Sequence, residues 1–364
     1  MSFDPYLPRL VREWEGGPGA LELDGTLVSA DLSGFTRLSE RLQAKGRAGA
    51  EELVLAVSGV FEGLIGVAER HGGDVLKFRG DALLLFFSGD NHEGRASLAA
   101  TQMQWLIGEI GTMMSSVGSV TLRMSTGIYS GKCNFFLVEG THRELVVAGP
   151  AATATIELED AAASGEILVS DGTAAALNTS WLGERRGNAY VLQTAEEPEV
   201  FAHLAARSAP EDQALEIYIP EPLRAHLLLE QGEAEHRHVT AAFVKFSGTD
   251  TVIREQGAEA AYARFATLAA AVGDAAQRLG LTWLESDIDR DGGKLYLVGG
   301  APSSTGADED HMLRGLQEVL GAIDSLELRA GVNRGPAFCG DIGDRKSTRL
   351  NSSHPRLSRM PSSA

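Results

Sequence analysis

The sequence predicts an α/β (α+β) protein built from two ferredoxin-like domains in tandem, the second of them incomplete. Three segments, "TLVSADLSGFT" (26–36), "LKFRGDALLLFF" (76–87) and "STGIYSGKC" (125–133), return in the same order as "TAAFVKFSGTD", "RDGGKLYLVGG" and "RAGVNRGPA". Matching Asp31 with Lys245, Asp81 with Lys294 and Gly127 with Gly331 gives offsets of 214, 213 and 204 residues. Such nearly constant offsets favour a duplicated domain over chance.

Hydrophobic periodicity predicts the elements of the first copy. Leu27–Ala30 is expected to be a strand, and the apolar spacing that follows predicts a helix ending at Gly46. Residues 51–70 carry one apolar stripe and predict a second helix, and 75–87 predict a β-hairpin that turns at Arg79–Gly80. The remaining predicted elements are a helix over 91–114 and strands over 121–129, 133–138, 144–148 and 166–170.

Composition excludes several classes of function. The 364 residues suffice for two domains, and 43% hydrophobic with 23% charged residues is typical of a globular protein. A formal net charge of −18 argues against binding to nucleic acid or to an anionic membrane. No run approaches the ~20 apolar residues of a membrane span, and no signal-peptide core is present. Cys133 and Cys339 lack metal-ligand spacing, so we expect a protein of the reducing cytoplasm.

The chain divides into four parts. Residues 1–198 are expected to form the first domain and 237–343 the second, truncated and degenerate one; 199–236 mix Pro, Glu and His and predict a linker. Residues 344–364 contain "DRKSTRLNSSH" and "SRMPSSA", which resemble the two ends of a translated sequencing adapter. We therefore expect the native sequence to depart from this one near Gly343, the alternative being a native basic tail.

Two aspartates, Asp31 and Asp81, stand where a packed sheet favours hydrophobic residues. Asp31 ends one predicted strand and Asp81 begins an adjoining one, so both carboxylates can converge on one site. Paired carboxylates suit Mg²⁺ or Mn²⁺, with phosphate oxygens and water completing the coordination. Gly34 permits a tight turn whose backbone N–H groups can cradle phosphate. The alternative for the two aspartates is structural, as a helix N-cap and a turn residue.

The segments "VSADLSGFTRLSE" (28–40) and "GGDVLKFRGDALLLFF" (72–87) together resemble the signature pair of the class III adenylyl/guanylyl cyclases, above all their tandem soluble, bicarbonate-type branch. The resemblance covers about 24–190 and, less completely, 237–343. It implies two homologous nucleotidyl cyclase domains that pair with each other within the chain and form the active site at their interface. It also implies conversion of ATP to 3′,5′-cyclic AMP and pyrophosphate, and a C-terminal regulatory region in the intact protein.

The family roles fall on specific positions of the first copy. The resemblance makes Asp31 and Asp81 the ligands of two Mg²⁺ or Mn²⁺ ions, with the Leu32 carbonyl as an added ligand. It implies in-line attack of the ribose 3′-hydroxyl on the α-phosphorus without a protein nucleophile. The residues implied to lie against the β- and γ-phosphates are Ser33, Gly34, Phe35 and Thr36.

The second copy departs from the family pattern. Lys245 and Lys294 replace the carboxylates, which leaves one metal site per tandem; the two lysines either pair with neighbouring acids or contact phosphate. The base-recognising lysine of the family falls on Asp291, with Arg290 beside it. The Asn-x-x-x-Arg pair of the family, whose arginine stabilises the transition state, would lie beyond Gly343.

The first copy is not expected to complete its own active site. It has Lys77 at the base-recognising position, but Thr153 and Glu157 at the Asn-x-x-x-Arg positions. Lys77 is therefore either a pocket residue or a plain ion-pair lysine. We expect an adenylyl cyclase whose present chain has little activity alone; the alternative is an inactive nucleotide-binding or sensory module of a larger signalling protein.

Overall fold

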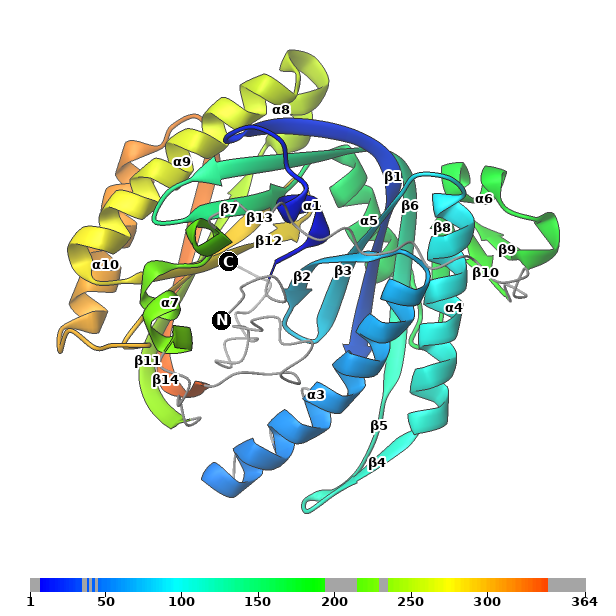
Figure 1. Ribbon diagram of the computed structural model, residues 1–364, viewed down its shortest axis with the longest axis horizontal. Coiled ribbons are helices and arrows are strands. Elements are labelled where there is room, and N and C mark those ends of the chain that lie inside the picture. The colour runs from blue at the N-terminus through cyan, green and yellow to red at the C-terminus, as the bar shows by residue number, and fades with distance from the viewer. Residues whose placement is uncertain are drawn as a thin grey trace.

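The computed structural model of the chain describes residues 7–34, 38, 41–42, 45–193, 215–228 and 235–339. Within these residues two large sheets lie side by side, each with helices of its own, and a short ribbon projects from one end (Figure 1). The fold is therefore the mixed α/β type that the sequence predicts. No helix of the described part is both long and apolar enough to cross a membrane.

The first sheet has eight strands in the order β2-β3-β1-β6-β8-β10-β9, with β7 paired to β6. Its central part, β2-β3-β1-β6, has the strand order of a ferredoxin-like core. The strands are β1 (Gly19–Ser33), β2 (Asp74–Arg79), β3 (Ala82–Ser88), β6 (Arg123–Glu139), β7 (Arg143–Val147), β8 (Ile167–Ser170), β9 (Leu182–Arg186) and β10 (Ala189–Leu192).

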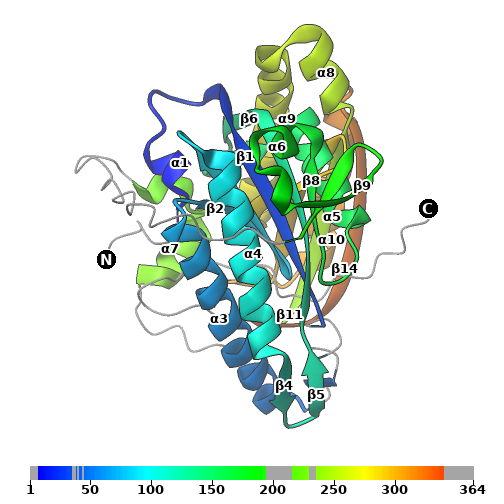
Figure 2. The same ribbon diagram turned by 90° about the vertical axis from the view of Figure 1, so that its right-hand side faces the viewer.

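Helices cover both faces of this sheet because side chains alternate along its strands. α3 (Arg47–Arg70) and α4 (His92–Ile110) lie side by side over the face that carries Val28 and Leu32 (Figure 2). α5 (Pro150–Ala161) covers the opposite face, which carries Leu27. Asp31 follows Leu27 by four residues on β1 and therefore lies on the same face of the sheet, the one that α5 covers. The small helices of this half are α1 (Arg9–Arg12), α6 (Asp171–Ala176) and the 3-10 turn η2 (Thr179–Trp181).

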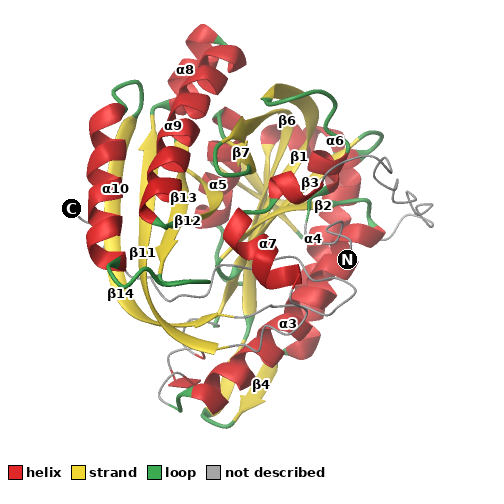
Figure 3. Cartoon of the chain, turned by 60° about the vertical axis from the view of Figure 1, so that its left-hand side comes forward, coloured by secondary structure: helices red, strands yellow, loops and turns green. Residues whose placement is uncertain are grey.

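The second sheet has the order β12-β13-β11-β14, which repeats that of the first core. Its strands are β11 (Glu235–Ser247), β12 (Thr282–Asp289), β13 (Gly292–Gly299) and β14 (Glu327–Cys339). The helices α8 (Thr249–Gln256), α9 (Ala258–Leu279) and α10 (Asp308–Ala322) belong to it, and α9 and α10 run along one face (Figure 3). Between the halves, η3 (Leu215–Tyr218) and α7 (Glu221–Leu228) are described within the predicted linker.

The two halves share packed surface. Phe136 and Val138 of β6 belong to the same buried cluster as Val244 and Trp283 of the second half. At the turn after β6, a Cβ added to Gly140 would lie 2.5 Å from the Trp283 ring, so only glycine allows this approach. The second half is thus packed on an extension of the first sheet.

Three element predictions require correction. The predicted helix over 91–114 ends at Ile110, because Gly111 adopts a positive φ of 56°, and a ribbon of β4 (Thr112–Ser115) and β5 (Gly118–Thr121) follows. The predicted strands 121–129 and 133–138 are one strand, β6, because β1 pairs with it continuously. The hairpin turns at Gly80–Asp81, one residue later than predicted.

Candidate active site

Asp31 and Asp81 lie at neighbouring strand ends. Asp31 pairs in register with Ala82 of β3, and the Leu32 N–H donates to the Asp81 carbonyl at 3.0 Å. Asp81 itself lies in the two-residue turn between β2 and β3. Burial, and next the negative charge of Asp81, raise the pKa of Asp31 from 3.8 to about 7; Glu159 and Asp160 add to the rise and Arg79 opposes it. The two predicted carboxylates are therefore close enough to interact electrostatically.

The donor set at this edge fits a hard divalent cation. Two carboxylates that repel each other in a partly buried site are what a divalent cation neutralises, and oxygen ligands are those that Mg²⁺ and Mn²⁺ prefer. The Leu32 side chain is buried in the core, so only the backbone of this residue can contact a cation here. In the described part of the chain no group of three or more His, Cys, Asp or Glu side chains is arranged to hold a metal ion. The fit therefore rests on two carboxylates with non-protein oxygens.

The backbone after β1 turns sharply beside these carboxylates. Gly34 has a φ of +111°, and a Cβ at this position would lie 2.8 Å from the Thr121 carbonyl oxygen, so the turn requires glycine. The Ser33 hydroxyl donates to the Arg123 carbonyl at 3.3 Å and lies 3.2 Å from the Ser164 hydroxyl. Of the four predicted phosphate-contacting residues, Phe35 and Thr36 lie outside the described residues.

Arg79, which no sequence pattern singles out, is a cation close enough to lower the raised pKa of Asp31. Its Nη1 donates to the Ser29 hydroxyl and to Glu159 Oε2, both at 3.0 Å, and its Nε donates to Asp287 Oδ1 at 2.9 Å. The Arg79 side chain is only 13% exposed. Burial opposes the charged form, but Asp287 and Glu159 outweigh it and raise the pKa of Arg79. One guanidinium thus links β1, α5 and the second half beside the carboxylate pair.

Helix α5 reaches the site because β6 has a glycine beneath it. A Cβ on Gly127 would lie 2.4 Å from both the Glu159 nitrogen and the Thr155 carbonyl oxygen of α5. Gly127 pairs with Ser29 in β1, and the Ser29 hydroxyl donates to Glu159 Oε2 at 2.8 Å. Glycine at 127 therefore sets the distance between α5 and the sheet.

Strand register refines the internal repeat. When Ser33–Gly34 is matched to Ser247–Gly248, Asp31 falls on Lys245, as predicted. Gly127 falls on Gly331, also as predicted, because each glycine pairs with the residue four positions before the matched serine. Lys294 pairs with Lys245, whereas Asp31 pairs with Ala82; the match of Lys294 to Asp81 is wrong by one residue. The β12–β13 hairpin is longer and turns at Arg290–Asp291, so two more residues of each strand are paired.

The two replacement lysines have a protein partner. Lys245 Nζ lies 3.2 Å and Lys294 Nζ 3.6 Å from the same oxygen of Asp289. Burial raises the pKa of Asp289, but the charges of Lys294 and Lys245, together with the Arg290 backbone N–H, outweigh it and lower that pKa. Of the two alternatives left open by the sequence, pairing with a neighbouring acid is the contact that the structure contains.

Asp291 and Arg290 contact the first half rather than a base pocket. Asp291 Oδ2 accepts from the Gly248 N–H and Oδ1 from the Asp250 N–H, both at 3.0 Å. The Asp291 N–H donates to the Thr153 hydroxyl at 2.8 Å, and Arg290 Nε donates to Asp160 at 3.1 Å. Asp291 is thus a turn residue and not the counterpart of Lys77, a correction that follows from the longer hairpin.

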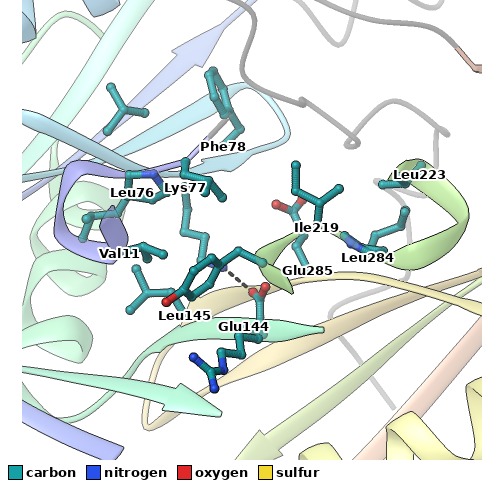
Figure 4. A pocket seen from close by; sticks show the side chains of 16 residues that line it. Val11, Leu76, Lys77, Phe78, Glu144, Leu145, Ile219, Leu223, Leu284 and Glu285 are labelled. Atoms are coloured by element: carbon teal, nitrogen blue, oxygen red, sulfur yellow. Dashed lines mark hydrogen bonds and ion pairs between the residues drawn. The ribbon is translucent and has the colours of Figure 1, made fainter. Parts of the chain in front are cut away.

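Lys77 lies in a buried ion pair with Glu144 of β7, and both side chains are less than a tenth exposed. Glu144 Oε1 also accepts from the Ser286 N–H at 2.6 Å and from its hydroxyl at 2.7 Å, and Oε2 lies 3.2 Å from His142 Nε2. The pair forms one wall of a pocket of about 100 Å³ between the halves (Figure 4). Of the two alternatives for Lys77, the ion pair is the contact that the structure contains, and the residue also lines this pocket.

Comparison with known proteins identifies the family. Residues 24–203 match the family described as the adenylate and guanylate cyclase catalytic domain. The chain belongs to the class III nucleotidyl cyclases. It is 26% identical over 158 residues to adenylate cyclase type 10 of Oryctolagus cuniculus, a match that covers 42% of this chain and only 10% of that protein.

One of two similar solved structures shares the fold over most of the chain. A class III adenylyl cyclase-like ATP-binding protein from Pseudomonas aeruginosa is 12% identical and superposes with a TM-score of 0.60, over 91% of this chain and 78% of its own. The adenylyl cyclase CyaB from P. aeruginosa is 21% identical, with a TM-score of 0.39 over 50% of this chain and 99% of its own. The first of these likenesses extends the shared fold over both halves of this class III cyclase.

Proposed function

We propose that this cyclase is an adenylyl cyclase of the cytoplasm, which converts ATP into 3′,5′-cyclic AMP and pyrophosphate for intracellular signalling. The observation that carries the proposal is the position of Asp31 and Asp81 at adjoining strand ends; burial first, and then the charge of Asp81, raise the pKa of Asp31 to about 7. A site that concentrates negative charge in this way is built for cations and for the phosphates that they accompany. The relative named adenylate cyclase type 10 supports ATP over GTP.

The residues of the chain bind and orient the reactants in this proposal. Asp31 and Asp81 would hold two Mg²⁺ or Mn²⁺ ions, which supply positive charge at the triphosphate and favour ionisation of the ribose 3′-hydroxyl. The Leu32 carbonyl is an added ligand, and the turn at Ser33–Gly34 presents backbone to the β- and γ-phosphates. Arg79 pairs with Glu159 of α5 and Asp287 of β12 and so offsets part of the negative charge around Asp31 and Asp81.

The second half acts as the partner of the first in this proposal. We infer that residues 1–198 and 237–343 are two cyclase domains that pair within one chain, joined by 199–236. Lys245 and Lys294 leave a single cation site in the pair, because they present positive charge where the first half has Asp31. The family's Asn-x-x-x-Arg pair and a C-terminal regulatory region would belong to the natural continuation beyond Gly343.

The test measures binding and turnover separately. For binding, a fluorescent ATP analogue is titrated into the chain with Mn²⁺. For turnover, the chain extended by its natural continuation is supplied with ATP and GTP, and cyclic AMP and cyclic GMP are measured. Asp31→Asn and Asp81→Asn should weaken Mn²⁺-dependent binding at least tenfold and abolish turnover, because each removes a ligand. Asp24→Asn is the matched control, since Asp24 is an exposed carboxylate on the same strand.

Each outcome has a distinct meaning. Cyclic AMP formation that depends on both carboxylates supports the cyclase, and cyclic GMP as the main product would replace ATP with GTP as the substrate. Metal-dependent nucleotide binding without turnover would identify the alternative, an inactive nucleotide-binding or sensory module. Full turnover in Asp81→Asn would refute the assigned site.

A further inference from the structure

Strands β2 and β12 occupy equivalent positions in the two sheets but carry opposite charges. Arg79 pairs with Ala82, which pairs with Asp31; in the second sheet Asp287 pairs with Lys294, which pairs with Lys245. By the same register, Lys77 corresponds to Glu285. The first strand therefore presents two cations where its counterpart presents two carboxylates.

These opposite charges meet where the halves contact each other. Arg79 donates to Asp287 at 2.9 Å, and the two equivalent side chains are 13% and 21% exposed. Arg79 also holds Glu159 of its own half, so one cation serves one carboxylate from each half. Next along β2, Lys77 Nζ lies 3.4 Å from the Ser286 hydroxyl of β12. Arg79 and Asp287 are thus equivalent residues in contact, as expected beside a pseudo-twofold axis, and Lys77 contacts the residue next to its equivalent.

We propose that this charge opposition makes the first half select the second half as its partner and reject a second copy of itself. If two first halves paired through this surface, Arg79 would face Arg79 in a partly buried site; two second halves would place Asp287 against Asp287. Like charges removed from water repel strongly, whereas the unlike pair is hydrogen-bonded. The inference rests on the proposed pairing of the halves within the chain and adds what specifies it.

Apolar packing supplies contact area but not this selection. The shared cluster contains Phe136, Val138 and Trp283, which a hydrophobic surface of another copy could also cover. Charged groups at the centre of a contact discriminate between partners because a wrong partner leaves them unpaired. The equivalent pair Arg79 and Asp287 is therefore the specificity determinant, and the cluster around it stabilises whichever arrangement the charges permit.

The experiment uses the full chain and hydrogen–deuterium exchange, which reports separation of the halves without requiring activity. Asp287→Lys places a cation against Arg79, and Arg79→Gln leaves Asp287 and Glu159 facing each other. Either change should accelerate exchange in β2, β7 and β12 about tenfold or more. In the double variant Arg79→Gln/Asp287→Lys, Lys replaces the missing cation beside Glu159, so exchange should slow to within about threefold of the parent. Asp324→Lys, an exposed change of equal charge, is the control.

The outcomes separate the inference from its alternatives. Failure of the double variant to recover, or exchange within about twofold of the parent in Asp287→Lys, would overturn it in favour of packing alone. If Asp287→Lys does not fold by far-UV circular dichroism, Asp287→Asn replaces it with a smaller expected acceleration. Sedimentation of the parent should give a monomer at all concentrations, and a dimer that protects β2 and β12 would also overturn it. Loss of cyclase activity in Asp31→Asn or Asp81→Asn, with the exchange rates of the parent, concerns only the proposed function.

Discussion

Glu144 offers a quantitative test of how the halves are joined. Its carboxylate is buried, pairs with Lys77 of β2 and accepts two hydrogen bonds from Ser286 of β12. Burial alone would raise the pKa of Glu144, but the charge of Lys77 and the hydrogen bonds from His142 and Lys77 outweigh it and lower the pKa from 4.5 to about 2. The ionised carboxylate is therefore stabilised in the folded state.

The size of the effect follows from the shift. A change from 4.5 to about 2 corresponds to roughly 3 kcal/mol of folding free energy, which agrees with the ~3–5 kcal/mol cost of breaking a buried ion pair. Because the folded pKa is depressed, this contribution is complete above the unfolded value and is lost as the pH falls through about 2. The variant Glu144→Gln should thus lose about 3 kcal/mol at pH 7 and almost nothing, relative to the parent, at pH 2.

The assay is urea denaturation at several pH values, followed by tryptophan fluorescence and far-UV circular dichroism. Other acids titrate in the same range, so the quantity of interest is the difference between variant and parent at each pH. Glu139→Gln is the matched control, because Glu139 forms an ion pair with Arg143 at 3.7 Å but is 63% exposed. An exposed pair of this kind contributes about 0–1 kcal/mol. A difference for Glu144→Gln that stays constant from pH 7 to pH 2 would refute the reasoning.

A second variant identifies the origin of the loss. Adding Lys77→Met to Glu144→Gln removes the ammonium group that the first change leaves buried without a counter-charge. Replacement of a buried pair by groups of similar volume is often neutral, so most of the lost stability should return. If the double variant is less stable than Glu144→Gln alone, the cost arises from the lost volume and hydrogen bonds and not from the unpaired charge.

Two further predictions concern glycine packing and the carboxylate pair. Gly127→Ala should destabilise the fold by roughly 1–3 kcal/mol in thermal or urea unfolding, because the added Cβ would lie 2.4 Å from the backbone of α5. The control is Gly108→Ala in α4, which has open space and should stabilise the fold by up to about 1 kcal/mol. Equal effects of the two changes would contradict the packing argument. Asp81→Asn should lower the pKa of Asp31, measured by carboxyl-carbon NMR, because it removes a neighbouring negative charge. Asp24→Asn should leave that pKa unchanged, and a shift there would show that the effect is not local.

The fold was predictable where periodicity and pairing act over short distances. The helix α3 has an apolar stripe that determines its buried side, and the hairpin of β2 and β3 is a continuous apolar run that is buried on both faces. The repeat predicted the same strand order in both sheets. The lengths of elements were less predictable, because Gly111 ends α4 early and β1 pairs with β6 over more residues than either strand's own pattern indicates. Partners of a strand therefore decide its length as much as its sequence does.

The carboxylate pair was predictable and its surroundings were not. Asp31 and Asp81 stand out because an acid at a strand end interrupts an apolar run. Arg79 has no such signal, since an arginine beside a turn is ordinary, and its partner Asp287 lies 208 residues further along the chain. Local patterns carry no information about which distant acid a buried cation will meet. The selection of partners across the two halves thus became visible only with the fold.

The two hairpins also differ in where they place an acidic side chain, which accounts for the single cation site of the proposed function. In the first half the turn at Gly80–Asp81 leaves a carboxylate beside Asp31. In the second half the longer hairpin places Asp291 beyond the equivalent position, and its carboxylate accepts hydrogen bonds from the backbone N–H groups that follow β11. Backbone N–H groups that follow a strand can bind phosphate. In the second half the Asp291 carboxylate accepts these hydrogen bonds, so the N–H groups are not available to a bound phosphate. Two extra residues in each strand of one hairpin therefore replace the edge that we propose binds a ligand with a contact within the protein.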